Sequence, residues 1–418
     1  MIRFYNGKVL TMYGDMAVTD DEVWVDGDKI AYVGKDCTEQ ADQEIDLHGN
    51  LLMPSFKNAH THSAMTFLRS YADDLPLANW LNDRVFPMEA RLRPGDIAPL
   101  SALAFAEYLT SGCTACFDMY YFQEETARAS VESGFRTVFT CGLNNFQESV
   151  EKLEEYYNRF NRYDKLIAYR LGFHAEYTTS GEIMQGVAGL AHKYEAPVFM
   201  HASETKSEVD DCKKRWGKTP AALFEDLGLW DFGGGAYHSV WVSDDDLEIY
   251  KRKNIWAVIN AGSNCKLASG VAPVQKMMDM GIPIAVGTDG PASNNCLDMF
   301  KEMFLIAASQ KLLLHDAAAC DADKILYAAT AGSAHCMGLA DCDTIAPGKQ
   351  ADLIVIDLHR PNMQPINNIT KNLVYAGSKE NVKMTMCAGK ILYENGECKT
   401  IDTEKVYREA QAVIDRMR

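Results

Sequence analysis

A chain of 418 residues is long enough for one large domain together with a smaller one. Its apolar fraction of 47% and charged fraction of 24% are ordinary for a globular protein, and no apolar run approaches the roughly 20 residues that span a bilayer. The net charge of -17 argues against nucleic acid or an anionic membrane as a partner, because both need a basic face. We therefore expect a cytoplasmic protein.

Both ends of the chain have the short strands and turns of a β-sheet. The early strands, separated by turns such as Asp26-Gly27-Asp28, predict a small antiparallel sheet, and a similar texture returns near the end. We expect the two ends to pair in one discontinuous β-sandwich domain, residues 1–52 and 345–418, which includes a C-terminal helix. The strands are predicted at residues 3–10, 21–25, 29–33, 352–357, 382–387 and 390–393.

The middle of the chain, residues 53–344, alternates apolar strands with amphipathic helices. Strands that are apolar on both faces and alternate with helices predict a parallel sheet, and eight of them predict a (β/α)₈ TIM barrel. The strands are expected to end near His60, Asp118, Gly142, His174, His201, His238, Asn260 and Asp289. Helices are expected at residues 97–111, 181–194, 244–253 and 297–314.

The twelve cysteines are scattered and mostly lie within apolar segments, which favours free buried thiols in a reducing compartment. Cys113 and Cys116 have the spacing of a redox or zinc motif. No second such pair lies at a suitable distance, so we assign them to a buried strand.

Metal-binding side chains collect at the predicted strand ends. His60 and His62, two residues apart, point the same way at the end of the first strand. With His201 and Asp289, from the fifth and eighth strands, they supply the nitrogen and oxygen ligands that a catalytic divalent metal needs. The pair alone is also compatible with ordinary surface histidines, so the prediction depends on the shared rim of the barrel.

Two further side chains near this rim are candidates for proton transfer. Glu204 follows His201 closely and is expected to act as a general acid and base toward a heteroaromatic nitrogen, although an acidic residue here could simply favour a helix N-terminus. Asp289 is expected to take a proton from the attacking water. His238 is either a fifth ligand or a neutral imidazole that hydrogen-bonds the nucleophile, and the sequence leaves both open.

Four motifs give the chain a family resemblance. It resembles the amidohydrolase superfamily, and within it the 5′-methylthioadenosine/S-adenosylhomocysteine deaminase and chlorohydrolase-like branch, over nearly its whole length. The resemblance implies one divalent metal, with zinc expected and iron or manganese as alternatives, and a homo-oligomer. The motifs are residues 54–62 (PSFKNAHTH), 201–205 (HASET), 263–267 (SNCKL) and 287–295 (GTDGPASNN).

The segment after the first strand, residues 63–94, has the length of a functional lid. By the resemblance, Glu89 would bind ribose hydroxyls, Trp80 would wall the pocket and His174 would hydrogen-bond the purine. The alternatives are that Trp80 belongs to the core and that Glu89 is a solvated helix residue. Cys141 stands where relatives that accept S-adenosylhomocysteine tend to carry arginine, so we expect a neutral 5′ group to be preferred.

The expected function is hydrolytic deamination of an aminated purine, and the expected substrate is an adenosine derivative such as 5′-methylthioadenosine, adenosine, 5′-deoxyadenosine or S-adenosylhomocysteine. The alternatives on the same scaffold are a free-base or pterin deaminase and a triazine chlorohydrolase or aminohydrolase. A binding protein without enzymatic activity is a rival class, since a fold does not determine function. The presence of Glu204 beside a complete ligand set argues against it.

Overall fold

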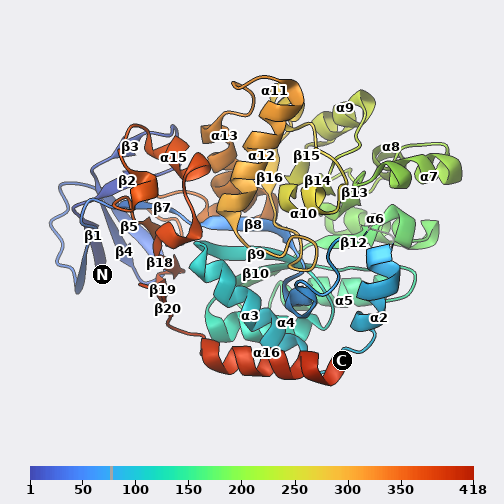
Figure 1. The fold of residues 1–418 in the computed structure, drawn as a ribbon, viewed down its shortest axis with the longest axis horizontal. Coiled ribbons are helices and arrows are strands. Elements are labelled where there is room, and N and C mark those ends of the chain that lie inside the picture. The colour runs from blue at the N-terminus through green and yellow to red at the C-terminus, as the bar shows by residue number, and fades with distance from the viewer. Residues whose placement is uncertain (76–78) are drawn as a thin grey trace.

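A parallel β-barrel forms the centre of the molecule (Figure 1). The computed structural model describes residues 1–75 and 79–418, so residues 76–78 of the predicted lid lie outside the described residues. The barrel strands are β8 (Phe56–Thr61), β9 (Cys113–Met119), β10 (Arg136–Thr140), β11 (Ile167–Tyr169), β12 (Leu171–Ala175), β13 (Val198–Ala202), β14 (Gly234–His238), β15 (Ile255–Ile259) and β16 (Ile284–Val286).

β11 and β12 are two parts of one barrel strand, interrupted at Arg170. The Arg170 amide donates to the Phe139 carbonyl at 2.8 Å, and the His174 amide donates to the Leu143 carbonyl at 2.9 Å. Both parts of the strand therefore lie beside β10 and the residues that extend it. At the other seam, the Asp289 amide donates to the His60 carbonyl at 3.0 Å. The described chain thus has eight strand positions, and the predicted TIM barrel is confirmed.

The seam between β8 and the end of β16 requires a very close approach of two backbones. A Cβ atom at Gly287 would lie 2.8 Å from the His60 amide nitrogen, which is closer than real Cβ contacts. Glycine is therefore needed here so that Asp289 can reach the rim beside His60.

Apolar side chains fill the inside of the barrel below the rim. Phe117 and Phe199 pack edge to face at 4.8 Å between ring centroids, and the Tyr237 ring stacks under the His60 imidazole at 3.7 Å. The barrel strands are buried on both faces, because their inner side chains pack inside the barrel and their outer side chains pack on the surrounding helices. The interior cluster comprises Ala59, Ala115, Phe117, Met119, Val138, Phe199, Tyr237, Val258, Ala285, Cys336 and Met337.

Four of the helices that surround the barrel match the predicted ranges 97–111, 181–194, 244–253 and 297–314 to within two residues. Several begin at side-chain caps that accept a backbone N–H, as Ser180 does for α6 and Ser243 for α9. The helices around the barrel are α3 (Ile97–Thr110), α4 (Gln123–Ser133), α5 (Val150–Phe160), α6 (Gly181–Tyr194), α7 (Lys206–Trp216), α8 (Pro220–Asp226), α9 (Asp244–Lys253), α10 (Ala261–Lys266), α11 (Val274–Asp279), α12 (Met299–Leu314), α13 (Ala322–Tyr327) and α14 (Ser333–Met337). The described lid contains a 3₁₀ turn (Ser63–Leu68), a π-helical turn (Trp80–Val85) and α2 (Phe86–Glu89).

Strands from both ends of the chain pair in the smaller β-rich region. One sheet has the order β5-β4-β1-β6, and the other, β20-β19-β18-β17-β7-β2-β3, joins strands of both termini. The predicted antiparallel pairing of the early strands is confirmed for β1 with β4 and β4 with β5. The sheets also contain two parallel pairings that were not predicted, β1 with β6 and β2 with β7. The long connection between each pair provides the crossover that parallel strands require.

These strands lie at the bounds that follow. From the N-terminus they are β1 (Ile2–Tyr5), β2 (Lys8–Leu10), β3 (Val18–Thr19), β4 (Glu22–Asp26), β5 (Lys29–Gly34), β6 (Gln43–Asp46) and β7 (Leu51–Pro54). From the C-terminal part they are β17 (Leu353–Ile356), β18 (Val382–Cys387), β19 (Lys390–Glu394) and β20 (Glu397–Cys398), with helix α15 (Ile369–Tyr375) between β17 and β18.

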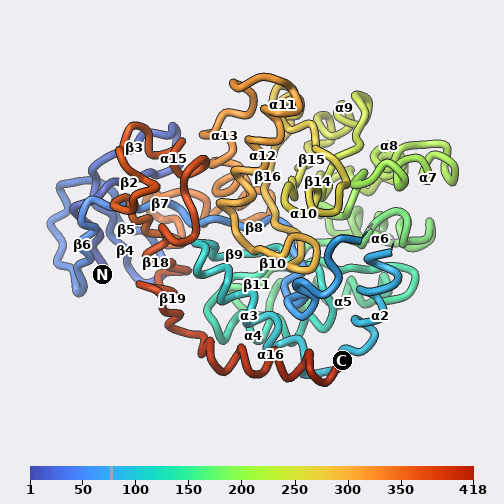
Figure 2. Tube along the Cα trace, viewed as in Figure 1, coloured from blue at the N-terminus to red at the C-terminus, as the bar shows by residue number. Residues whose placement is uncertain are grey.

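The last helix, α16 (Thr403–Met417), leaves this region and runs along α3, as the red end of the trace in Figure 2 shows. Arg416 pairs with Asp96 just before α3, and Thr400 donates to the Ser133 carbonyl at 2.6 Å. The C-terminal helix is therefore attached to barrel helices, while the predicted domain boundaries stay a prediction.

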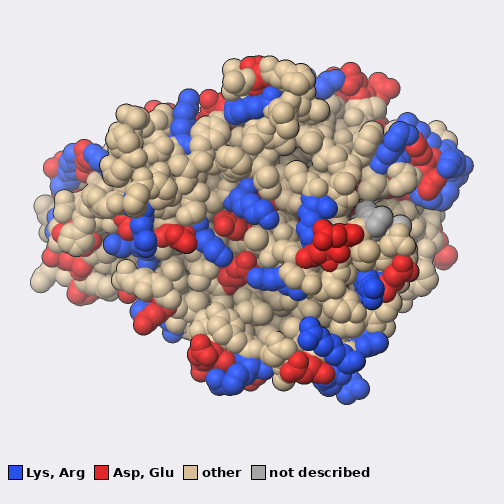
Figure 3. Space-filling view, in the orientation of Figure 1, with Lys and Arg blue, Asp and Glu red and all other residues tan. Residues whose placement is uncertain are grey.

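Within the described residues, no helix combines the length and apolar character required to cross a membrane. On the face drawn in Figure 3, acidic and basic side chains are interspersed.

Candidate metal centre and active site

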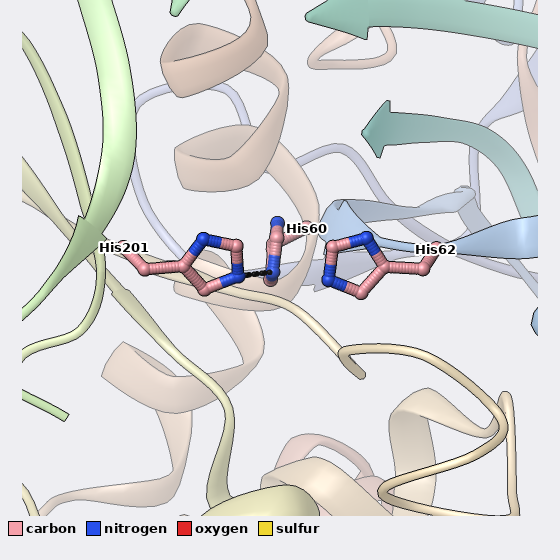
Figure 4. Close-up of side chains that lie close together, drawn as sticks. All are labelled: His60, His62 and His201. Atoms are coloured by element: carbon pink, nitrogen blue, oxygen red, sulfur yellow. Dashed lines mark hydrogen bonds between the residues drawn. The ribbon is translucent and has the colours of Figure 1, made fainter. Parts of the chain in front are cut away.

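Three histidines from two barrel strands converge at the carboxyl-terminal rim. His60 lies in β8, His62 follows it, and His201 lies in β13; their rings turn toward one another in Figure 4. The Nε2 atoms of His60 and His201 are 3.1 Å apart. Asp289 Oδ1 lies 3.3 Å from His62 Nε2 and 3.6 Å from His60 Nε2. The predicted ligand set is thus brought together.

Hydrogen bonds outside this cluster fix the orientation of the imidazoles. His62 Nδ1 lies 2.5 Å from the Met119 carbonyl and His201 Nδ1 lies 2.7 Å from the His174 carbonyl. A carbonyl oxygen can only accept, so each Nδ1 carries the proton and each Nε2 presents a lone pair to the centre. Metal-binding histidines commonly have this arrangement.

The buried histidines have the chemistry of metal ligands. Burial, together with the neighbouring imidazoles, lowers the pKa of His60 and of His201 well below the ordinary value. These rings are therefore neutral at pH 7 and cannot repel a cation. His60 Nδ1 is buried without a hydrogen-bond partner among the described residues. Two groups could hold a metal ion: His60, His62 and His201; and His60, His238 and Asp289.

Asp289 is held ionised by its surroundings. Burial would raise its pKa, but His238 and His62 outweigh burial and lower it. Ser263 and Ser293 donate to Oδ2 at 2.6 and 2.8 Å, and the Gly290 amide donates to Oδ1 at 2.7 Å. The carboxylate is thereby fixed with one oxygen toward the histidines.

Glu204 and His238 face each other across the centre. Glu204 Oε2 lies 3.8 Å from His238 Nε2, and His238 Nδ1 lies 2.8 Å from Asn264 Oδ1. Although burial lowers the pKa of His238, Glu204 and Asp289 raise it above the ordinary value. Its place in the second possible ligand group keeps both predicted roles of His238 open.

A cavity opens above these residues and is lined by the side chains expected to contact substrate. Trp80 is 6% exposed, so it belongs both to a core cluster and to the cavity wall. Glu89 is not a solvated helix residue: it faces the cavity and accepts a hydrogen bond from Tyr120 at 2.7 Å. His174 also lines the cavity, and burial lowers its pKa to about 4. Burial raises the pKa of Glu89 to about 7.

Several residues of the site were not identified from the sequence. Tyr120 supports Glu89, Asn264 supports His238, and Ser269 donates to Glu204 Oε1 at 3.0 Å. Tyr120 does come directly after β9, so the rule that strand ends carry function could have found it. Cys141 is a correction of detail: its side chain is buried, and the neighbouring Gly142 lines the cavity.

The sequence model of the Amidohydrolase family matches residues 51–392. The chain therefore belongs to the amidohydrolase family, whose members are metal-dependent hydrolases, and the predicted family is confirmed.

Similar proteins narrow the branch. The chain is 38% identical to the 5-methylthioadenosine/S-adenosylhomocysteine deaminase of Caldanaerobacter subterraneus, over 97% of this chain and 96% of that protein. It is 37% identical to the 5'-deoxyadenosine deaminase of Methanosarcina acetivorans, over 99% and 97% of the two chains. The structure of an adenosine deaminase from Xanthomonas campestris with bound zinc has a TM-score of 0.95 and 32% identity, covering 100% of this chain and 98% of that one. These likenesses agree with the branch that the motifs indicated.

Proposed function

We propose that the protein is a metal-dependent aminohydrolase that removes the exocyclic amino group of an adenosine derivative and releases ammonia. The observation that carries this proposal is the position of the Glu204 carboxyl, which lines one cavity together with His62, His201 and Asp289 of the ligand cluster and with Glu89. One pocket can therefore hold a purine at a metal centre and a ribose at a buried carboxyl. The three similar proteins described above are named as deaminases of adenosine or of its derivatives, which supports the same substrate class.

His60, His62, His201 and Asp289 would hold the metal, and zinc is favoured because a similar structure contains it. When bound at such a site, a divalent metal ion supplies a polarised water as the nucleophile. The sequence had left zinc, iron and manganese open, and the histidine-carboxylate set suits all three.

The protein's own groups move the protons. Asp289, whose carboxylate is held in place by Ser263, Ser293 and the Gly290 amide, accepts the proton of the attacking water and later passes it to the departing amine. Glu204 delivers a proton to the ring nitrogen beside the amine-bearing carbon, because its carboxyl lines the cavity with Oε2 3.8 Å from His238 Nε2. His238 hydrogen-bonds the attacking oxygen and keeps it oriented.

The remaining cavity residues would bind the substrate. Glu89 would accept hydrogen bonds from the two ribose hydroxyls, while Trp80 covers one side of the nucleoside. His174, neutral at pH 7, would hydrogen-bond the purine. A free base, a pterin or a triazine has no group for Glu89, which favours nucleosides over those alternatives.

The far end of the cavity favours a neutral 5′ substituent. None of the described residues that line the cavity is lysine or arginine. Tyr121, which does line it, has its pKa raised by burial and by the carboxylates Glu89 and Glu148. A homocysteine carboxylate would meet acidic neighbours there and would lose solvent without gaining a cation.

The experiment is ammonia release from a substrate panel by the purified protein, with and without a chelator. The panel contains 5′-methylthioadenosine, adenosine, 5′-deoxyadenosine, S-adenosylhomocysteine, guanine, a pterin and a triazine. We expect turnover of the neutral adenosine derivatives, a kcat/KM at least about tenfold lower for S-adenosylhomocysteine, and loss of turnover on chelation that added zinc restores. Comparable kcat/KM for S-adenosylhomocysteine would contradict the assignment of the 5′ end, and preferred turnover of a free base or triazine would contradict the nucleoside assignment.

Glu204→Gln tests the proton-transfer role. The amide keeps the shape but cannot deliver the proton, so we expect kcat to fall by about 10²–10⁴-fold with unchanged metal content. Near-native kcat in this variant would show that another group supplies the proton.

A further inference from the structure

Ser269 makes a buried hydrogen bond to the proton-transfer carboxyl. The side chain is 6% exposed, and its hydroxyl donates to Glu204 Oε1 at 3.0 Å. The other oxygen, Oε2, is the one that faces His238 Nε2, at 3.8 Å. The two oxygens of Glu204 are therefore not equivalent: one is occupied by Ser269, and the other faces the reaction centre.

The backbone around Ser269 is held in place from both sides. The Ser269 amide donates to the Asn264 carbonyl at 2.9 Å, and the Trp241 indole N–H donates to the Ser269 carbonyl at 2.7 Å. The next residue, Gly270, has φ of +129°, and a Cβ there would lie 2.8 Å from Val240 Cγ1. The hydroxyl of Ser269 is thus presented by a fixed turn, with little freedom to follow Glu204 if the carboxyl moved.

The same turn also orients His238, through the side chain of Asn264. One segment of the chain, residues 264–269, therefore supports both proton-handling groups at the ends of β13 and β14.

We propose that Ser269 is a positioning residue that holds Glu204 Oε1, so that Oε2 is the oxygen that carries the proton to the substrate ring nitrogen. This inference depends on the proposed deamination. Because Oε1 accepts from the serine hydroxyl, a proton on Oε1 would compete with that donor, and the proton resides on Oε2. The bond that forms is N–H on the ring and the bond that breaks is O–H at Oε2, which leaves Glu204 as a carboxylate that still accepts from Ser269. The second proton of the attacking water then returns to Oε2 as the product carbonyl forms, which restores the acid for the next turnover.

The test compares Ser269→Ala and Ser269→Thr with a matched control. Ser203→Ala is the control, because that hydroxyl is also buried, belongs to the residue before Glu204, and has no hydrogen-bond partner among the described residues. We expect kcat to fall about tenfold in Ser269→Ala, the effect of one charge-assisted hydrogen bond. We expect recovery to within about threefold in Ser269→Thr, which restores the hydroxyl, and no change in Ser203→Ala.

A second measurement separates positioning from a general defect. 1-Deazaadenosine has a carbon in place of the ring nitrogen that Glu204 protonates, so its binding should not depend on Ser269. We expect its inhibition constant, the metal content and the melting temperature to be the same in wild type and Ser269→Ala.

For a wild type that deaminates a compound of the panel, two results would overturn the proposal. One is a kcat for Ser269→Ala within twofold of wild type; the other is an equal loss of turnover and of 1-deazaadenosine binding, which would indicate a structural role. Turnover is measured with whichever compound of the panel the wild type deaminates best, so a wrong substrate assignment leaves the Ser269 comparison intact. A wild type that deaminates nothing in the panel overturns both.

Discussion

The Tyr120–Glu89 hydrogen bond links substrate binding to pH at the scale of single residues. Burial raises the pKa of Glu89 to about 7, and the bond from the Tyr120 hydroxyl opposes this rise. Only the carboxylate form can accept from both ribose hydroxyls. The affinity for a nucleoside should therefore increase as the pH rises through 7.

Tyr120→Phe should raise the pKa of Glu89, because the hydrogen bond that lowers this pKa is lost. The increase in nucleoside affinity should then occur at a higher pH. We expect kcat/KM for adenosine at pH 7 to fall about fivefold, or about 1 kcal/mol, with the rise in kcat/KM displaced to higher pH. The measurement is a pH series of kcat/KM for the wild type and the variant.

The control substrate is 2′,3′-dideoxyadenosine, which lacks both hydroxyls and should show neither the rise near pH 7 nor an effect of the variant. If the two substrates responded to Tyr120→Phe alike, Glu89 would not be the ribose contact.

Single residues with strong chemical preferences were predictable from the sequence. His60, His201 and Asp289 are rare residue types at the ends of apolar strands, and the barrel rule places such ends on one rim. Tyr120, Asn264 and Ser269 act through hydrogen bonds to residues that are distant in the sequence or in another loop. Asn264 and Ser269 are residue types common in turns, so nothing local distinguished them, whereas Tyr120 directly follows β9 and was within reach of the strand-end rule.

At the scale of elements, the turn between β13 and α7 determines where Glu204 points. Glu208, in the first turn of α7, accepts from the backbone amides of Ser203 and Glu204, each at 2.8 Å. Thr205 and Glu208 form a capping box at the start of the same helix: the Thr205 hydroxyl accepts from the Glu208 amide, and the Glu208 carboxylate accepts from the Thr205 amide. The sequence-based alternative, that Glu204 is merely a helix N-terminal acid, fits Glu208 better, since Glu208 is the residue that caps the helix.

Glu208→Ala should disturb both stability and catalysis, because it leaves buried amides without an acceptor. We expect the free energy of unfolding to fall by about 3 kcal/mol and kcat to fall at least about tenfold, measured by denaturant titration and steady-state kinetics. Thr205→Ala removes the cap but leaves those amides paired, so we expect a loss of about 1 kcal/mol and almost unchanged kcat. Equal effects of the two substitutions on kcat would mean that the turn does not depend on Glu208.

The elements themselves followed from periodicity and length, as the bounds of α6 and α9 illustrate, which match the predicted residues 181–194 and 244–253. The parallel pairings of β1 with β6 and β2 with β7 did not, because the direction of a short strand depends on long-range contacts. The break at Arg170 was hidden for a similar reason: both halves of that strand are apolar.

At the scale of the whole molecule, a buried ion cluster joins the barrel to the sheet that combines the two chain ends. Asp352, next to β17, lies 3.0 Å from the Arg136 guanidinium of β10 and 3.8 Å from the Lys57 ammonium of β8. All three side chains are at least nine-tenths buried. Burial alone would raise the pKa of Asp352, but Arg136 and Lys57 outweigh it and lower the pKa to about 2.

Asp352→Asn should therefore destabilise the protein strongly, because it leaves two buried cations without their carboxylate. We expect the free energy of unfolding at pH 7 to fall by about 3–5 kcal/mol. The folded-state pKa of Asp352 is lower than the ordinary aspartate value of 3.8, so this stabilisation is present above about pH 4 and is lost as the pH falls toward 2. The difference between wild type and variant should narrow over that interval in denaturant titrations.

The matched control is Asp28→Asn. Asp28 also ties the N-terminal strands to the barrel, through Lys165 at 2.8 Å, but this pair is largely exposed and should contribute no more than about 1 kcal/mol. A loss in Asp352→Asn as small as that in Asp28→Asn would mean that the buried cluster adds no more stability than a surface ion pair. A large loss confined to Asp352→Asn would instead identify the cluster as the contact that makes the barrel and the terminal strands unfold together.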